Sequence, residues 1–496
     1  MTIALYVCNT ASMGRHFDVI IIGGGSVGCA TAYALARYDL RTLLLERCPD
    51  VCMGTSGKTS AVVHAGFNNR PGSLMAELCV KGNKLFEDVC RELDVPYKKT
   101  GKLVVALDEG DLPAIEKTLM DGERNGCVGL SMVGAAELSE MEPNVMGIAA
   151  LLSSNTAIID PFAYVIHLAE AALLGGAEFR LGSEVTAIER EPGRFRVVAG
   201  ENSYTCDVIV NSAGMYSDAV AALAGDASYR IYPNRGEYFI LDKQAAQITG
   251  RPIYPVPREG LGGLGVHLTP TIDGNLLIGP TSQYVDGRED YANTPGKMES
   301  LFKEARQLIP SLSMDMAIGA FTGMRAKIVP PGSANFGDFI IEESKIVPGL
   351  INLVGIESPG LTASMPIALL VCEMLRARHG LSEKSGRPAG YKRAPVFRDL
   401  DTDAQNELIS QNPDYGEIIC RCENVTKAEV INALNNPLGV RTLIGIKNRV
   451  RTMMGRCQGG YCFTHLADIL INEFGVDPKD VTYRSFGDTP FYGGNK

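Results

Sequence analysis

Hydrophobic positions in the first fifty residues predict a β–α–β unit. Asp18–Ile22 is a short apolar run of the kind that forms a buried strand. Ser26–Tyr38 is rich in alanine with helical spacing, and Arg41–Glu46 is a second apolar run. Two strands that are joined through a helix lie parallel in one sheet, so this part of the chain is predicted to be an α/β domain.

The pattern changes further along the chain. Strand-like Lys102–Leu107 precedes a charged helical stretch. Ala163–Leu174 and Cys206–Val210 again have the apolar helix and strand patterns of the N-terminal α/β unit. Tyr232–Gly279 contains several strands with alternating apolar positions, which is typical of an antiparallel sheet. The α/β pattern resumes after Phe321. We therefore predict an antiparallel α+β domain inserted into the α/β domain.

A glycine-rich turn joins the first predicted strand to its helix. Gly23–Gly28 fits the pattern G-x-G-x-x-G, and Glu46 ends the second strand. Glycines let the backbone approach a pyrophosphate, the helix N-terminus supplies N–H donors, and the acidic residue accepts hydrogen bonds from a ribose. The turn predicts a dinucleotide site but does not distinguish FAD from NAD. Gly54–Gly66, rich in small hydroxyl residues, suits a second backbone approach to the cofactor; a flexible loop is the alternative.

Composition excludes several classes of protein. The net charge of −10 argues against a nucleic-acid binder. No run of about 18 apolar residues is present, so no transmembrane helix is predicted. The first sixteen residues lack a secretory pattern and are interpreted as an N-terminal extension. Nine of the thirteen cysteines are scattered, as in a cytoplasmic enzyme, and any membrane association is expected to be peripheral, through a partner.

Several ordered stretches carry a resemblance to a known family. They are His64-Ala-Gly66 with Pro71–Leu74, Tyr97–Lys102, Arg235–Tyr238, Tyr254–Pro257, Gly265–Pro270, Gly323–Arg325 and Ser358–Thr362. With them, the chain from about Phe17 to Leu381 resembles the D-amino-acid-oxidase-like flavoproteins, and within these the L-2-hydroxyglutarate dehydrogenases and the catalytic subunit of anaerobic glycerol-3-phosphate dehydrogenases. The resemblance implies bound FAD, hydride transfer to the flavin, and oxidation of a secondary alcohol or an amine.

The resemblance and the hydrophobic pattern together divide the chain into four parts. They are a discontinuous Rossmann-type FAD-binding domain (residues 17–92, 145–225 and 320–381), an inserted antiparallel substrate domain (93–144 and 226–319), a polar linker (382–415) and a small four-cysteine domain (416–496).

Five residues are predicted to act on the substrate. His267 lies in a strand-like segment, and because imidazole titrates near neutrality it is the first candidate for the base that takes the hydroxyl proton. His64 is the second candidate, and a structural role is the alternative for both. The resemblance places Arg325 beside the flavin, where a guanidinium can hold the substrate anion through two parallel hydrogen bonds. It places Arg235 and Tyr238 along the same cavity.

Residues predicted to contact FAD come from the glycine turn, the second strand, the hydroxyl-rich segment, later strands and a second glycine-containing helix start. They are Gly23, Gly25, Ser26, Gly28, Glu46, Arg47, Thr55, Ser56, Ser60, Val185, Ala213, Gly214, Gly355, Gly360, Leu361 and Thr362. At the second helix start, N–H groups would face the end of the flavin at which reduction adds negative charge. An ordinary capped helix is the alternative there.

Four cysteines near the C-terminus have the spacing C-x-C and C-x4-C. Cys420, Cys422, Cys457 and Cys462 form a set of thiolates suited to a metal or cluster. The spacing resembles the bacterioferritin-associated-ferredoxin domain, which implies that all four ligate a 2Fe-2S cluster. Zinc is the less favoured occupant because its sites more often use C-x2-C. The basic stretch Lys447–Arg451 is interpreted as a solvated surface.

The sequence therefore predicts an FAD- and 2Fe-2S-containing dehydrogenase of a small anionic secondary alcohol. L-2-Hydroxyglutarate and glycerol 3-phosphate both remain candidate substrates. The alternatives are an amine or amino-acid dehydrogenase on the same fold, and an FAD-binding electron-transfer subunit without its own substrate. A flavin accepts two electrons and a cluster passes one at a time, so an electron-acceptor protein or partner subunit is expected.

Overall fold

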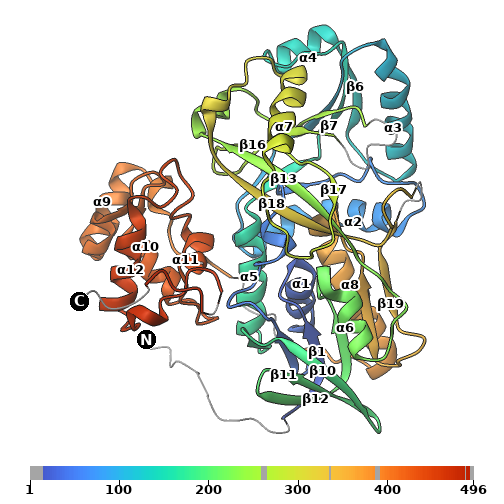
Figure 1. The fold of residues 1–496 in the computed structure, drawn as a ribbon, viewed down its shortest axis with the longest axis vertical. Helices are drawn as coiled ribbons and strands as arrows, with labels where there is room; N and C mark the ends of the chain where they lie inside the picture. The colour runs from blue at the N-terminus through green and yellow to red at the C-terminus, as the bar shows by residue number, and fades with distance from the viewer. Residues whose placement is uncertain (1–14, 258–264, 334–336, 386–390, 486, 492–496) are drawn as a thin grey trace.

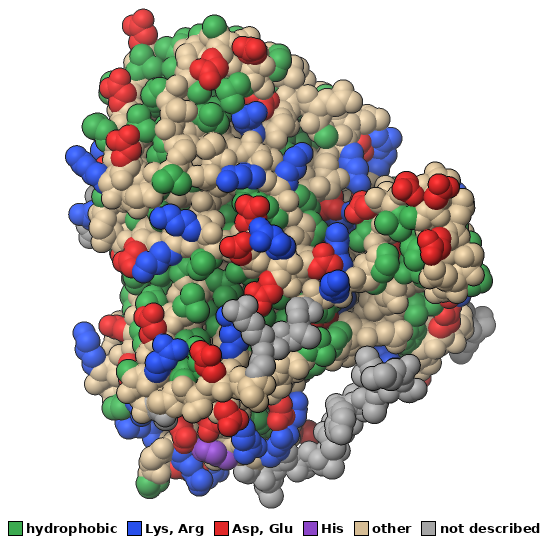
Figure 2. Space-filling model, turned by 180° about the vertical axis from the view of Figure 1, so that it is seen from behind, with side chains coloured by type: hydrophobic (Ala, Val, Ile, Leu, Met, Phe, Trp, Pro, Cys, Tyr) green, Lys and Arg blue, Asp and Glu red, His purple; other side chains and the backbone are tan. Residues whose placement is uncertain are grey.

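The computed structural model describes residues 15–257, 265–333, 337–385, 391–485 and 487–491, which form a two-part body with a C-terminal module beside it (Figure 1). The predicted N-terminal extension lies outside the described residues as far as residue 14. Its last two residues, Arg15 and His16, instead begin the first strand. In the view from behind, charged side chains of both signs are interspersed over the body (Figure 2).

The lower part of the body in Figure 1 is built on an eight-stranded sheet. Its order is β10-β11-β12-β1-β2-β9, with β20 beside β12 and β19 beside β20. The central neighbours run parallel, as the β–α–β pattern predicts. The bounds are β1 Arg15–Ile22, β2 Thr42–Leu45, β9 Glu178–Arg180, β10 Val185–Glu191, β11 Arg194–Ala199, β12 Asn202–Asn211, β19 Ile340–Glu343 and β20 Leu350–Val354.

Helices cover this mixed sheet. Every residue of α1 is buried, and α1 lies against α5 and α8, while α8 also packs on α2. Among the described residues, α8 is the one helix long and apolar enough to cross a membrane, and most of that stretch is buried. The bounds are α1 Ser26–Leu35, α2 Leu74–Glu92, α5 Pro161–Leu174, α6 Ser217–Leu223 and α8 Gly360–His379.

The upper part is a nine-stranded sheet in the order β17-β13-β16-β15-β14-β5-β7-β6, with β18 also paired to β13. Its pairs are antiparallel except for β14 with β5. The strands are β5 Lys102–Ala106, β6 Leu130–Gly134, β7 Ala149–Ser153, β13 Tyr232–Leu241, β14 Ile253–Pro255, β15 His267–Pro270, β16 Leu276–Gly279, β17 Gln283–Tyr284 and β18 Ala317–Lys327. The associated helices are α3 Leu112–Arg124, α4 Ala135–Met141 and α7 Pro295–Leu308. A small sheet of β3 Val62–Val63, β8 Ala157–Ile159 and β4 Tyr97–Lys99 completes the body.

Two strands belong to a different sheet from the one that the predicted domain boundaries imply. β7 and most of β18 fall in segments expected to belong to the FAD-binding domain, yet both pair within the upper sheet. β7 hydrogen-bonds to β5 on one side and β6 on the other, and β18 pairs along nearly the whole of β13. Backbone pairing therefore sets the boundary, which the hydrophobic pattern of each strand alone does not reveal.

The C-terminal module begins inside the predicted linker. Its elements are α9 Thr402–Gln411, β21 Ile418–Cys420, β22 Val425–Thr426, α10 Lys427–Leu434, α11 Leu443–Val450 and α12 Cys462–Asn472. Phe397 and Tyr415 pack together with Ala428 of α10, so the chain from about Phe397 onward folds onto the module. Residues 386–390 of the predicted linker lie outside the described residues.

A buried ion pair fastens the module to the FAD-binding domain. The Arg449 guanidinium of α11 lies 2.6 Å from Asp50 and 3.4 Å from Glu170 of α5. The side chain of Arg449 is 8% exposed, and those of Asp50 and Glu170 are 0% and 2% exposed. Arg451 pairs with Asp273 of the upper part at 2.7 Å. The interpretation of this basic stretch as a solvated surface is wrong, because carboxylates of the body enclose it.

We expect Arg449→Met to destabilise the full-length protein by about 3 kcal/mol, because it leaves two buried carboxylates without their cation. The free energy of unfolding in urea is the measurement. Arg91→Met is the matched control, since Arg91 lies in exposed pairs with Glu87 and Asp88 and its loss should change stability by less than about 1 kcal/mol. Equal effects of the two substitutions would contradict the anchoring role of Arg449.

Candidate functional site

A large cavity runs between the two parts of the body. Its volume is about 1590 Å³. One end is formed by the glycine turn and the start of α1, and the other by side chains of β13, β14, β15 and β18. Residues 54–71 run along it, and Arg484 and Ser485 of the C-terminal module complete its wall. The cavity therefore borders all three folded parts of the chain.

The glycine turn has the geometry that a dinucleotide requires. Gly23 has a φ of +107°, and a Cβ on it would lie 2.6 Å from the Ser212 carbonyl oxygen. A Cβ on Gly28 would lie 2.0 Å from the Gly23 carbonyl oxygen, so only glycine lets α1 pack this closely. The N–H group of Ser26 at the start of α1 donates to Ser56 Oγ at 2.9 Å, beside the cavity.

Glu46 lies where a ribose-binding carboxylate is expected. Its carboxylate accepts hydrogen bonds from the N–H groups of Gly24 at 2.6 Å and Cys48 at 2.8 Å. It lines the cavity next to the glycine turn. A glycine turn at a helix start, lining a cavity beside a carboxylate, fits the pyrophosphate and ribose of FAD.

Most of the predicted cofactor residues line the cavity. They are Gly23, Gly25, Ser26, Glu46, Arg47, Thr55, Ser56, Ser60, Ala213, Gly214, Gly360 and Leu361. Gly28, Val185, Gly355 and Thr362 do not line it, and their role at the cofactor stays a prediction. Gly28 serves helix packing, and Glu184 rather than Val185 reaches the cavity. Thr362 is fully buried, and its hydroxyl accepts the N–H of His64 at 3.0 Å.

His267 combines a fixed proton with a free acceptor atom. Its Nδ1 lies 3.0 Å from the Gly265 carbonyl oxygen, which can only accept, so Nδ1 carries the proton. Nε2 is buried and has no hydrogen-bond partner among the described residues, and the side chain lines the cavity. Burial, followed by the charge of Lys102, holds the imidazole pKa well below 6.5. The ring is therefore neutral and presents an unoccupied acceptor to the cavity.

Three side chains form a stack across neighbouring strands β15, β14 and β5. The ring of Tyr254 lies parallel to that of His267, with 3.8 Å between centroids and 8° between planes. The Lys102 ammonium lies 3.7 Å from the Tyr254 ring centroid. Lys102 is fully buried, and its Nζ has no hydrogen-bond partner among the described residues. Burial lowers the Lys102 pKa to about 7.

No motif in the sequence assigns Lys102 a function, although a lysine at the start of the apolar run Lys102–Ala106 is a signal. A charged side chain in a fully buried strand is uncommon without a partner. Its partner here is the face of the Tyr254 ring. The two residues are far apart in the sequence, so a local pattern does not reveal this contact.

Arg325 brings an uncompensated positive charge to the cavity. Its Nη1 donates to Asn234 Oδ1 at 2.6 Å, and both terminal nitrogens lie 3.3 Å from the Thr281 carbonyl oxygen. Within the described ranges it makes no ion pair with a carboxylate, unlike Lys327, which pairs with Glu357 at 2.9 Å. Arg325 therefore has the charge and the position to hold an anion.

Tyr238 lines the cavity as predicted, whereas Arg235 does not. Tyr238 stacks on Phe321, with 4.7 Å between ring centroids. Successive residues of a strand point to opposite faces, so Arg235 on β13 faces away from Tyr238 across an odd separation. The Arg235 guanidinium is buried against Asp290 at 2.7 Å and Glu237 at 3.4 Å. The expectation that Arg235 lines the cavity is wrong.

His64 lines the cavity near the start of α8. Its Nε2 lies 3.5 Å from Ser358 Oγ. Burial and the Lys102 charge lower its pKa to about 3. Both candidate bases are thus neutral imidazoles, but the Nε2 of His267 has no partner in the described residues, whereas that of His64 has Ser358.

The four cysteines of the module come together in two pairs. The Cys420 thiol lies within hydrogen-bond reach of Cys462, and Cys422 within reach of Cys457. Cys420 and Cys462 are buried, whereas Cys422 and Cys457 are exposed. Two pairs suit a binuclear cluster with one pair on each iron. A tetrahedral zinc site would instead bring all four sulfurs to about 3.8 Å from one another.

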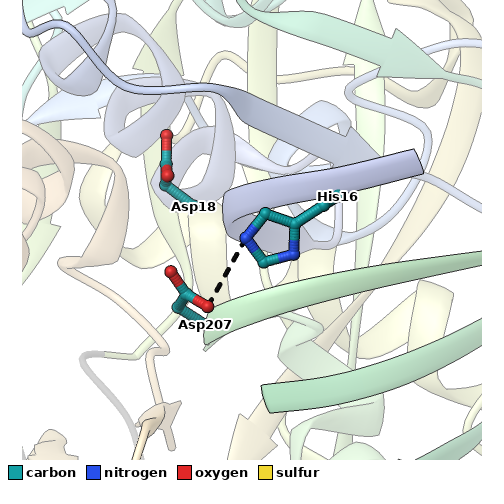
Figure 3. A group of neighbouring side chains, drawn as sticks. All are labelled: His16, Asp18 and Asp207. Atoms are coloured by element: carbon teal, nitrogen blue, oxygen red, sulfur yellow. Dashed lines mark ion pairs between the residues drawn. The ribbon is translucent and has the colours of Figure 1, made fainter. Parts of the chain in front are cut away.

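A separate polar group lies at the outer end of β1. His16, Asp18 and Asp207 are the one trio of this kind among the described residues whose ligand atoms all lie within 4.8 Å of one another (Figure 3). His16 lies 3.5 Å from Asp207, and Asp18 already accepts the Arg41 N–H at 2.6 Å. All three are partly exposed, so this group is an ordinary surface arrangement. Among the described residues, no three of the cysteine sulfurs lie within 4.8 Å of one another in this way.

Comparison with known proteins identifies both parts of the chain. Residues 18–374 match the family DAO, FAD dependent oxidoreductase, and residues 418–472 match the BFD-like 2Fe-2S binding domain. A protein described as glycerol 3-phosphate dehydrogenase, from Caloramator mitchellensis, is 37% identical over 468 residues, which cover 94% of this chain and 96% of that protein. A mitochondrial L-2-hydroxyglutarate dehydrogenase from Nematostella vectensis is 30% identical over 75% of this chain and 93% of its own.

A solved structure shows the same fold with the cofactor present. The L-α-glycerophosphate oxidase of Mycoplasma pneumoniae, with FAD bound, superposes with a TM-score of 0.72 at 29% identity, covering 77% of this chain and 99% of that one. The matches confirm the predicted FAD and 2Fe-2S cofactors and the mixed α/β fold class, and they leave no support for zinc. The chain belongs to the DAO family of FAD-dependent oxidoreductases and carries a C-terminal BFD-like 2Fe-2S domain.

Proposed function

We propose that this protein is a dehydrogenase of glycerol 3-phosphate whose electrons leave through the 2Fe-2S cluster. The observation that carries the proposal is the similarity to a glycerol 3-phosphate dehydrogenase across 94% of the chain, both domains included. The similarity to the L-2-hydroxyglutarate dehydrogenase of Nematostella vectensis extends over 75% of the chain. The substrate cavity and the cluster module therefore have a common counterpart in the first relative.

Arg325 is proposed to hold the substrate phosphate. Its guanidinium is anchored by Asn234 and by the Thr281 carbonyl but not neutralised by a carboxylate in the described chain. A guanidinium can donate two parallel hydrogen bonds to a phosphate or carboxylate. This fixes the alcohol carbon relative to the cavity wall that carries His267 and Tyr238.

His267 is proposed to take the proton of the substrate hydroxyl at Nε2. When FAD is bound, the flavin supplies the acceptor for the hydride from the alcohol carbon. The Gly265 carbonyl keeps the proton on Nδ1, and Tyr254 holds the imidazole ring in its plane. His64 lines the same cavity and remains the second candidate.

The module is proposed to receive the electrons and pass them to an acceptor protein or partner subunit. Gly319 of β18 approaches Gln458, next to Cys457, since an added Cβ on it would lie 3.3 Å from Gln458 Oε1. Gly323, four residues along the same strand, lines the cavity. Four residues of extended chain span about 13 Å, so β18 links the two sites over a short path. The proposal includes a cytoplasmic location, which the free thiols of the described cysteines suit.

Anaerobic mixing of the full-length, cofactor-loaded protein with candidate substrates tests the proposal. We expect fast loss of flavin absorbance with glycerol 3-phosphate, followed by reduction of the cluster. In Arg325→Met, the substrate concentration for half-maximal bleaching should rise by about tenfold or more, because a charge-assisted contact is lost.

Other outcomes of the same experiment would replace the proposal. Bleaching by L-2-hydroxyglutarate alone would identify a hydroxy-acid dehydrogenase, and bleaching by an amino acid an amine-oxidising enzyme. If no compound bleaches the flavin while a reduced partner protein does, the chain is an electron-transfer subunit without its own substrate.

Lys102→Met is expected to move the acid limb of the kcat/KM profile to higher pH. His267 accepts a proton only when neutral, and burial, Lys102, His64 and Arg325 hold its pKa low. Below the Lys102 pKa of about 7 the ammonium is charged, so its removal lets the imidazole pKa rise. The variant then loses activity at a pH at which the unaltered enzyme retains it.

The profile is measured between about pH 5 and pH 8, the range in which an ordinary histidine titrates. Lys99→Met, an exposed lysine of β4, is the matched control and should leave the profile unchanged. An unaltered profile in Lys102→Met, in a protein that still binds FAD, would exclude this electrostatic control of the base.

Cys462→Ala should abolish the 2Fe-2S cluster while leaving FAD bound. Cys462 is proposed as a ligand together with Cys420, Cys422 and Cys457, and a cluster is not expected to survive the loss of a buried thiolate. Iron, acid-labile sulfide and FAD are determined per chain. Cys372→Ala, which removes a buried thiol of α8, is the control and should keep the full iron content. Iron retained in full by Cys462→Ala would contradict its role as a ligand.

A further inference from the structure

The C-terminal module brings positive charge to the cavity wall. Lys58 and Arg484 both line the cavity, although one belongs to the FAD-binding domain and the other to the module. Both lie over the ring of Tyr291, with Lys58 Nζ 4.1 Å and the Arg484 guanidinium carbon 5.6 Å from its centroid. Two cations from distant parts of the sequence thus meet at one point of the wall.

The Glu289 carboxylate of the same cavity lies close enough to act on Arg484, but its ion pair is with Arg47. Neither Lys58 nor Arg484 forms an ion pair in the part of the chain that the structure describes, whereas the neighbouring Arg47 is paired with Glu289. Burial and the nearby Arg484 lower the pKa of Lys58 to about 8. Placing two cations together in a partly buried wall is unfavourable unless an anion compensates them.

Lys58 lies close to the start of α1. Lys58 directly follows the turn Thr55–Gly57, and Ser56 of that turn holds the N–H of Ser26 at the start of α1. The start of this helix, after the glycine turn, is where the pyrophosphate of a dinucleotide binds. Lys58 and Arg484 therefore line the cavity between the glycine turn and β18, where an added Cβ on Gly323 would lie 2.4 Å from the Lys58 carbonyl oxygen.

The backbone of the module holds Arg484 in place. The carbonyl oxygens of Thr482 and Tyr483 accept hydrogen bonds from Leu443 at 3.0 Å and Ile444 at 2.9 Å, at the start of α11. The same helix carries Arg449, whose buried pair with Asp50 docks the module on the FAD-binding domain. Docking through α11 thus delivers Arg484 to the cavity on a short, hydrogen-bonded segment.

We propose that Arg484, together with Lys58, clamps the pyrophosphate of FAD, so that the cluster module completes the cofactor site. The module then has two functions: it carries the cluster and it helps to retain the flavin. This inference requires bound FAD but not any particular substrate, and its test is therefore independent of the substrate proposal.

The dissociation constant of FAD from the full-length protein tests the clamp. Apoprotein of Arg484→Met is titrated with FAD, and the quenching of flavin fluorescence is followed. We expect the dissociation constant to rise about tenfold or more, and to depend less steeply on salt, because a charge-assisted contact to phosphate is lost. Arg441→Met is the matched control, since Arg441 belongs to the same module but lies over Phe474, outside the cavity lining.

Two further variants and the iron content of each sample distinguish a phosphate contact from a structural role of Arg484. Arg484→Lys retains the charge and should restore most of the affinity, which a merely structural arginine would not predict. Lys58→Met combined with Arg484→Met should show non-additive losses, because both side chains share one anion. An unchanged FAD dissociation constant in Arg484→Met overturns the proposal, as does a rise in the KM for the alcohol without any change in FAD binding. Iron content equal to that of the unaltered protein shows that the module is folded in each variant.

Discussion

The contact between α1 and β1 at Gly28 is the constraint on which the rest of the molecule depends. Only glycine fits where a Cβ would lie 2.0 Å from the Gly23 carbonyl oxygen, and this contact seats a fully buried helix on the parallel sheet. α1 in turn supports α5 and α8. The starts of α1 and α8 both reach the cavity, at Ser26 and Gly360. One backbone contact thereby positions two helix N-termini, each suited to negative charge, along one cavity.

Unpaired positive charge is the common electrostatic feature of that cavity. Four cations make no ion pairs in the described chain: Arg325 of β18, Lys58 after the turn Thr55–Gly57, Arg484 of the module, and Lys102, which is buried beside the Tyr254 ring. Two other buried cations are paired, Arg449 with Asp50 and Arg235 with Asp290. Anionic ligands are therefore expected to stabilise the folded protein, by an amount that grows with the logarithm of ligand concentration over the dissociation constant.

Much of the fold and part of the site could be predicted from local patterns. The glycine turn with Glu46, the parallel β–α–β start and the spacing of the four cysteines are short-range features whose chemistry is evident within a few residues. Strand alternation likewise places His267 on a single face. The predictions that differ from the structure depend on partners far along the chain. These partners are the carboxylates that hold Arg235 away from the cavity, the strands with which β7 and β18 pair in the upper sheet, and the carboxylates that enclose Arg449. The alternation of residues along a strand shows that its two faces differ, but not which face lines a cavity. A basic stretch in the sequence does not reveal which carboxylates pack against it in the fold.

Docking of the module links the two cofactor sites through elements that serve both. Helix α11 carries the buried Arg449 anchor and supports the segment that presents Arg484 to the cavity, while the loop with Cys457 and Gln458 meets β18. β18 then continues to Gly323 and Arg325 at the cavity. A two-electron oxidation at the flavin must be divided into single-electron steps at a cluster, and such a division is useful only if the two centres stay at a fixed, short separation. A buried ion pair costs desolvation and is weak evidence for stability in general, but breaking it is expensive, so it suits a joint that must not open. The same reasoning accounts for a module that packs on the body and borders the cavity through Arg484.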